Sequence, residues 1–153
     1  MAASERRREQ RPDRRRFPRG GRRLMDRPGR YPTVLIADSY EAARVPYARY
    51  LHRYGFQVEE AADGERALAA INAAPPHVIL VEHDLPALSA GRLGHWLAQN
   101  WRTRHIPLIV LAANNAVSVD TARPPRPAGV LVKPFRLNQM LNEIRRVLRT
   151  RLE

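Results

Sequence analysis

The sequence contains no cysteine and, in 153 residues, a single lysine, Lys133. Without cysteine the chain can form neither disulfides nor thiolate metal sites. No run of 18 apolar residues occurs, and the N-terminus lacks the apolar core of a secretory signal. We therefore expect a cytoplasmic protein with no membrane contact.

Positive charge is concentrated at the N-terminus. The formal net charge is +12, and residues 1–30 supply +8 of it, from 12 arginines against four acids. This segment has few apolar residues and no periodicity, so it cannot bury enough surface to offset the entropy cost of ordering. We predict a disordered arginine-rich tail over residues 1–30, followed by one domain over residues 31–153.

Three interpretations of the tail stay open. Arginine-rich segments bind the phosphates of nucleic acid electrostatically, and the same charge suits an acidic protein. Alternatively, Met25 is the true start and residues 1–24 are not translated. The tail contains one aromatic residue, Phe17, so it lacks the interleaved rings that stack on bases.

Short apolar segments alternate with amphipathic segments after the tail. The apolar segments predict strands over residues 33–37, 56–60, 78–81, 106–111 and 130–132. The amphipathic segments predict helices over residues 41–54, 63–74, 89–101, 114–122 and 137–148, with Asp63 and Ser89 as N-caps. The fourth helix is weak, because Pro124, Pro125 and Pro127 follow it. This alternation predicts an α/β fold with a doubly wound, five-stranded parallel sheet.

Function in such a sheet lies where the strands end. Ligands of open α/β sheets bind beyond the carboxyl ends of the strands. Asp38, Glu82, Ala112 and Lys133 each come directly after an apolar strand segment. We expect these four residues to share one site.

Several segments together resemble the receiver domains of two-component response regulators. They are residues 34–38, 62–68, 78–86, 106–111 and 132–135, and their order and spacing make the match specific. The resemblance covers about residues 32–150. It implies a flavodoxin-like fold and a role in bacterial phosphorelay signalling, as a signalling module rather than an enzyme.

The resemblance also implies roles for individual residues. In receivers an aspartate four residues before a proline accepts the phosphoryl group, and here that position is Glu82. Two acids that hold a divalent metal correspond to Asp38 and Ser39. The hydroxyl residue that contacts the phosphoryl group corresponds to Ala112, and the conserved lysine to Lys133. The aromatic switch position, three residues before the lysine, is Val130.

The substituted positions argue against normal phosphorylation. The extra methylene of Glu82 displaces the carboxylate by roughly one bond length, which disturbs an in-line attack. Asp38 and Glu82 still offer two carboxylates, so weak magnesium binding is one expectation, although we expect no resident cofactor. Ala112 removes a hydrogen bond to the transferred group.

Two interpretations of Glu82 remain. In one, its longer side chain pairs with Lys133 and fixes one conformation without a signal. In the other, it is a solvated acid with no special partner. Asp84 is a second carboxylate in this loop, but as a displaced acceptor it would require a slip of about 7 Å along the strand.

The preferred functional interpretation is a pseudo-receiver without an output domain, which acts by protein contacts. Its partners would be a histidine kinase or an output protein, or a second copy in a dimer. The shortened fourth helix alters the surface that family members commonly use. A working phospho-acceptor and a nucleic-acid binder that uses the tail are the alternatives. We expect Trp96 and Trp101 to pack in the core, with an exposed Trp101 as a candidate partner contact.

Overall fold

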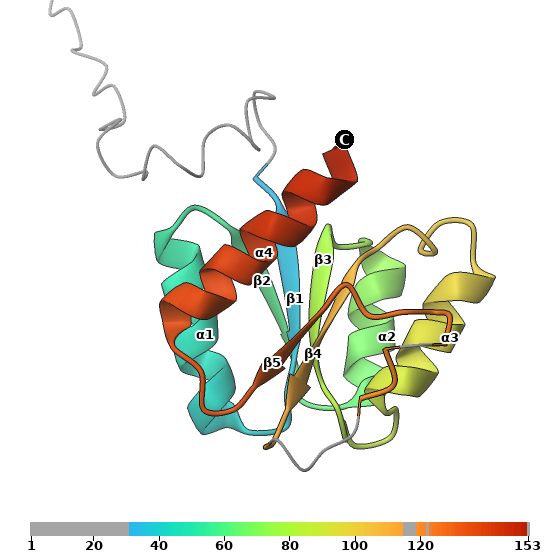
Figure 1. Cartoon of the computed structure of the whole chain (residues 1–153), viewed down its shortest axis with the longest axis horizontal. Coiled ribbons are helices and arrows are strands. Elements are labelled where there is room, and N and C mark those ends of the chain that lie inside the picture. Colours follow the sequence, from blue (N-terminus) through green and yellow to red (C-terminus); the bar gives the residue numbers. More distant parts are fainter. Residues whose placement is uncertain (1–30, 115–118, 122, 153) are drawn as a thin grey trace, which may run out of the picture.

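A computed structural model describes residues 31–114, 119–121 and 123–152. The predicted tail lies outside the described residues, so its disorder remains a prediction. Five parallel strands form one sheet in the order β2-β1-β3-β4-β5 (Figure 1). They are β1 (Thr33–Ala37), β2 (Gln57–Ala61), β3 (Val78–Glu82), β4 (Leu108–Ala112) and β5 (Gly129–Val132).

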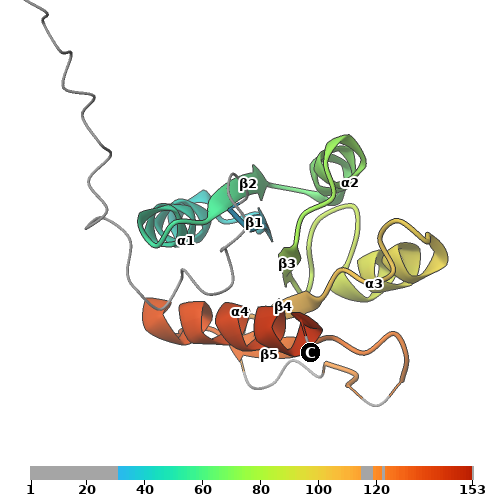
Figure 2. The ribbon, with the colours of Figure 1, turned by 90° about the horizontal axis from the view of Figure 1, so that it is seen from above.

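Four helices cover the two faces of this sheet. They are α1 (Glu41–Arg53), α2 (Gly64–Ala73), α3 (Ala90–Gln99) and α4 (Leu137–Leu152). Helices α1 and α4 lie on one face, and α2 and α3 lie on the other (Figure 2). The predicted doubly wound parallel sheet is confirmed. Among the described residues, no helix has both the length and the apolar character needed to cross a membrane.

Two apolar cores lie on opposite faces of the sheet. Successive residues of a strand point to opposite faces, so neighbours in β1 enter different cores. Ile36 belongs to the same core cluster as Ile144 of α4, whereas Leu35 belongs to the cluster that contains Leu93 of α3. Because the central strands are buried on both faces, their sequences read as continuous apolar runs.

Side-chain caps fix the starts of two helices. Asp63 Oδ1 accepts a hydrogen bond from the Arg66 amide at 2.8 Å, and the Ser89 hydroxyl accepts one from the Arg92 amide at 3.4 Å. Both capping residues agree with the sequence prediction. Helix α1 continues through Pro46 to Arg53, although the proline lacks the amide hydrogen of an interior helical residue.

The helix predicted over residues 114–122 is absent from the described part of that segment. Residues 114 and 119–121 are not helical, and residues 115–118 and 122 lie outside the described set. Residues 123–128, which we call the proline strap, lead to β5 without regular structure. Three prolines remove amide donors from the strap and disfavour helical backbone before each of them.

Candidate functional site

The carboxyl ends of β1, β3, β4 and β5 meet at one edge of the sheet. Asp38 follows β1, Glu82 ends β3, Ala112 ends β4 and Lys133 follows β5. Strands β1 and β3 are neighbours at the centre, so their terminal residues lie side by side. The topology therefore gathers the predicted residues in one place, as expected for parallel strands.

Glu82 is bonded to Ser39 through both carboxylate oxygens. The Ser39 amide donates to Oε2 at 2.9 Å. The Ser39 hydroxyl lies 2.8 Å from Oε2 and 3.2 Å from Oε1. We call this arrangement the Ser39–Glu82 clasp. It ties the loop after β1 to the end of β3, using the position where the resemblance places a second metal-binding acid.

Lys133 pairs with Asp38. The Lys133 ammonium lies 2.5 Å from Asp38 Oδ2, and the Tyr40 amide donates to Oδ1 at 2.9 Å. Asp38 is fully buried, so the ammonium compensates a carboxylate that water does not reach. Both interpretations of Glu82 are therefore wrong, because Lys133 pairs with Asp38 and Glu82 has Ser39 as its partner. The long lysine side chain reaches past the end of β3 to β1, where the buried charge lies.

Two further residues of the site were not anticipated. The Tyr40 ring lies 5.4 Å from the Lys133 ammonium and is 65% exposed, so it covers the ion pair from the solvent side. Arg44 donates to the Asp38 carbonyl at 2.8 Å and pairs with Glu60 at 3.0 Å. The local sequence does not predict the contacts of Tyr40 and Arg44, because both depend on where α1 begins relative to β1.

Tyr47 connects α1 to the loop beyond Lys133. Its ring stacks on Phe135 with 5.2 Å between the ring centroids. Burial raises the pKa of the Tyr47 hydroxyl above its ordinary value, and the nearby Asp38 carboxylate raises that pKa further. The hydroxyl therefore stays protonated beside the Asp38 carboxylate through the physiological range.

The other predicted positions have different surroundings. Ala112 is buried, and its carbonyl accepts a hydrogen bond from the Lys133 amide at 2.8 Å. Val130 is half-buried and packs against the core beneath α2 and α3. The Asp84 side chain is 79% exposed and contacts His83, and no hydrogen bond or ion pair links it to Asp38 or Lys133 in the described structure. The site thus joins Asp38, Ser39, Glu82 and Lys133 and leaves Asp84 outside.

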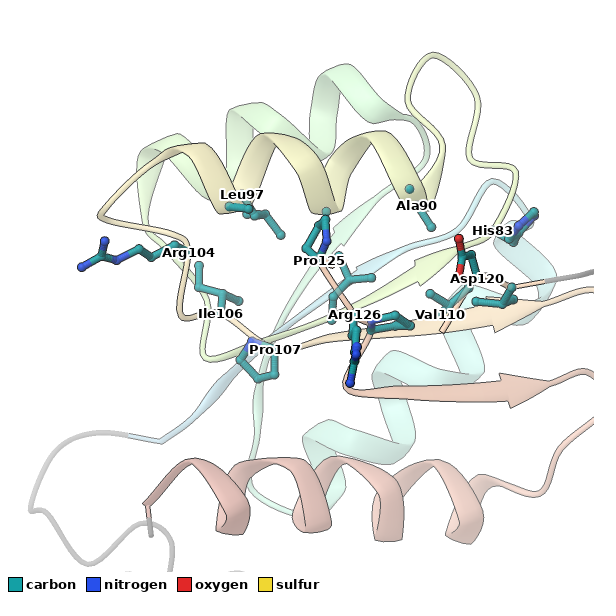
Figure 3. A pocket seen from close by; sticks show the side chains of 16 residues that line it. His83, Ala90, Leu97, Arg104, Ile106, Pro107, Val110, Asp120, Pro125 and Arg126 are labelled. Atoms are coloured by element: carbon teal, nitrogen blue, oxygen red, sulfur yellow. The ribbon is translucent and has the colours of Figure 1, made fainter. Parts of the chain in front are cut away.

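A cavity of about 290 Å³ lies between α3, β4 and the proline strap. Leu97, Ile106 and Val110 give it an apolar lining (Figure 3). His83, which follows Glu82, lies at one end with Asp120, and Arg104 lies at the other (Figure 3).

Comparisons with known proteins agree with this geometry. Residues 34–145 match the family model of the response regulator receiver domain. The response regulator-like protein PRR1 of Oryza sativa subsp. japonica is 32% identical over 126 residues, which cover 80% of this chain and 24% of that protein. The response regulator MprA of Mycolicibacterium vanbaalenii is 31% identical over 117 residues, which cover 76% of this chain and 50% of that protein. The chain thus spans half or less of these relatives.

Solved structures give the same result. The chemotaxis response regulator CheY4 of Vibrio cholerae has a TM-score of 0.69 and 26% identity, and the match covers 77% of this chain and 99% of that one. A response regulator from Chloroflexus aurantiacus has a TM-score of 0.72 and 25% identity, and the match covers 78% of this chain and 99% of that one. Both support the five-stranded, doubly wound architecture.

Proposed function

Because the chain belongs to the response regulator receiver domain family, we propose that it is a pseudo-receiver, a two-component signalling domain that does not use aspartyl phosphorylation. The observation that carries the proposal is the Ser39–Glu82 clasp. It engages both oxygens of the side chain at the acceptor position. A carboxylate held in this way is a poor nucleophile, since attack requires a free lone pair aimed at the phosphorus.

The surrounding residues also fail to support phosphoryl transfer. Ala112 has no hydroxyl to bond a transferred group. Lys133 is engaged with Asp38, so its charge neutralises that acid in place of a phosphoryl oxygen. The aliphatic Val130 has no ring whose rotation could report phosphorylation. Each group that would hold or sense the phosphate is therefore replaced or occupied.

The same residues do not fit a magnesium ion. Magnesium in proteins is held by carboxylate oxygens and water in an octahedron. Asp38 accepts hydrogen bonds from Lys133 and Tyr40, and both oxygens of Glu82 bond Ser39. Ser39, at the position of the second metal-binding acid, offers a hydroxyl in place of a carboxylate. A metal bound to Asp38 would also have to displace the Lys133 ammonium. No step of the proposed function depends on a metal.

Signalling would then proceed through protein contacts. Receiver domains act on kinases and output proteins as partners, and we propose partners of this class. The Asp38–Lys133 pair and the clasp use only groups of the chain itself, and we propose that they hold the carboxyl-end surface in one shape. A partner would recognise the domain itself, and regulation would lie in the amount or location of either protein.

The proposal is tested with a small phosphodonor. We expect no gain of a phosphoryl group in the intact mass of the full chain after incubation with acetyl phosphate and magnesium. A Ser39→Asp/Glu82→Asp/Ala112→Thr variant restores an acceptor, a metal acid and a hydroxyl, and it should gain one phosphoryl group. Lys133 is unchanged in this variant, so it is available to pair with the product.

Phosphorylation of the unaltered chain would overturn the proposal. In that case Glu82→Gln and Asp84→Asn would identify the acceptor, because only one of the two substitutions would abolish the mass gain. Asp84 is the matched control, since it lies in the same loop and is largely exposed.

A further inference from the structure

Acidic side chains of the described domain concentrate toward one end of the sheet, where cations such as Arg92 and Arg136 also lie. These carboxylates lie in β2, at the carboxyl ends of β1 and β3, and in the loops and helix starts that follow the strands. They are Asp38, Glu41, Glu59, Glu60, Asp63, Glu65, Glu82 and Asp84. The described loops at the opposite end, residues 31–32, 54–56, 74–77 and 100–107, contain no acid. The domain therefore has an acidic end and a basic end.

Exposed arginines mark the basic end, which we call the amino-end surface. Arg53 ends α1, Arg102 and Arg104 lie in the turns before β4, and Arg149 lies near the end of α4. None of the four forms an ion pair with a carboxylate of the described residues. Figure 3 shows Arg104 pointing away from the cavity, at the end remote from His83.

Among the residues that the structure describes, Glu143 is the carboxylate near this surface, and an arginine already neutralises it. Glu143 of α4 lies beside Gly129, where β5 begins. Its Oε1 pairs with Arg146, which also donates to the Ala128 carbonyl at 2.7 Å. The charge of the four exposed arginines is therefore left for a partner outside the described chain.

Exposed aromatic rings lie on the same surface. Trp101 follows α3 directly and is 77% exposed, and Tyr31 precedes β1 and is 43% exposed. An indole left in water beside two arginines has no packing role in the described domain. Rings of this kind offer flat faces on which unpaired bases stack, while arginines bond the phosphates.

We propose that the amino-end surface binds single-stranded nucleic acid. Arg53, Arg102, Arg104 and Arg149 would contact the phosphates, and Trp101 would stack on a base. A duplex fits less well, because its bases are already stacked on one another. An anionic membrane also fits less well, because Val147 and Leu148, the aliphatic residues described in the last turns of α4, are buried and cannot insert.

The test measures binding of the full chain to a labelled oligothymidylate of about 20 nucleotides by fluorescence anisotropy over a range of salt concentrations. The variant Arg102→Gln/Arg149→Gln removes two phosphate contacts. Each contact contributes about 0.7 to the slope of log affinity against log salt, so the slope should fall by about 1.4. The control Arg92→Gln/Arg136→Gln removes the same charge from exposed arginines at the carboxyl end and should keep the slope.

A second variant tests the stacking residue. Trp101→Ala should weaken binding by about tenfold, and Trp101→Phe should retain most of the affinity because it keeps a ring. Equal losses in the arginine variant and its control, or no loss in either, would overturn the proposal, since charge alone or the N-terminal segment would then account for binding. Tighter binding to a duplex or to anionic vesicles than to the oligonucleotide would also overturn it.

Discussion

A single ammonium group stabilises the most buried charge of the domain. Asp38 is fully buried, and the Lys133 side chain is 19% exposed, so the pair lies where water screens it weakly. A carboxylate in this position costs several kcal/mol of desolvation unless a partner offsets it. The only lysine of the sequence therefore has a structural role, which is to compensate the buried charge of Asp38.

Removal of that ammonium should destabilise the fold. We expect Lys133→Met to lower the free energy of unfolding by about 3 kcal/mol, because it leaves Asp38 charged and buried. The double variant Asp38→Asn/Lys133→Met should recover much of the loss, since it removes both charges. Urea denaturation measures both values. Arg136→Met is the control, and as an exposed residue it should change stability by less than about 0.5 kcal/mol.

A different outcome would identify a different partner for the buried acid. If Lys133→Met and the double variant were equally unstable, the charge of Asp38 would not be the cause of the loss. The packing of the lysine stem beside Tyr40 would then be the dominant contribution.

Individual residues of the site were predicted better than their contacts. The positions of Asp38, Glu82 and Lys133 follow from strand ends and spacing, which are local features. Neither interpretation of Glu82 anticipated the Asp38–Lys133 pair, because the distance between β1 and β5 depends on strand order and on how far a lysine reaches across β3 and β4. Ser39 was identified as a substituted position, but its bonds to Glu82 depend on the turn after β1.

At the scale of elements, the loops at the carboxyl ends are fixed by close backbone contact. The Gly64 amide donates to the Pro86 carbonyl at 2.7 Å, which joins the start of α2 to the loop before α3. A Cβ atom on Gly64 would lie 2.2 Å from Leu88 Cβ and 2.8 Å from the Leu88 amide nitrogen. Backbone cannot give way as a flexible side chain can, so this approach requires glycine.

Replacing Gly64 and Gly91 with alanine should therefore have opposite effects on the free energy of unfolding. We expect Gly64→Ala to lower the unfolding free energy by about 1–3 kcal/mol, because one loop must move to relieve the overlap. A Cβ on Gly91, in the first turn of α3, would meet no atom within 4 Å. Gly91→Ala should raise stability by about 0.5 kcal/mol through the better helix propensity of alanine. Thermal unfolding of both variants makes the comparison, and a loss in Gly91→Ala equal to that in Gly64→Ala would contradict it.

Most elements could be predicted from periodicity, and the exceptions have physical causes. The predicted fourth helix was wrong for the described residues 114 and 119–121, because the prolines of the strap outweigh a weak apolar pattern. The core packing predicted for the two tryptophans holds for Trp96, which packs against the core beneath α3. It is wrong for Trp101, because α3 ends at Gln99 and the indole projects from the following turn.

For the whole molecule, the sheet is covered unevenly. Strands β1 and β3 have a strand on each side and helices on both faces, whereas β5 pairs only with β4 (Figure 1). On the α3 face, the neighbours of β4 include the cavity and the proline strap. The parallel sheet and the alternation of strands with helices were predicted from the sequence, but the strand order and this asymmetry were not, because both depend on how the elements pack.

Uneven cover should produce uneven local stability. We expect amide hydrogen exchange to be slowest in β1 and β3, with opening free energies close to that of global unfolding, because their amides are released only when both cores separate. Exchange in β5 should be clearly faster, since it is an edge strand that pairs only with β4 and three of its four residues are only half-buried. Exchange measured residue by residue in the folded state separates these cases. If β5 were as well protected as β3, the strap would stabilise the edge as firmly as a helix does, and the cavity would not be a weak point of the fold.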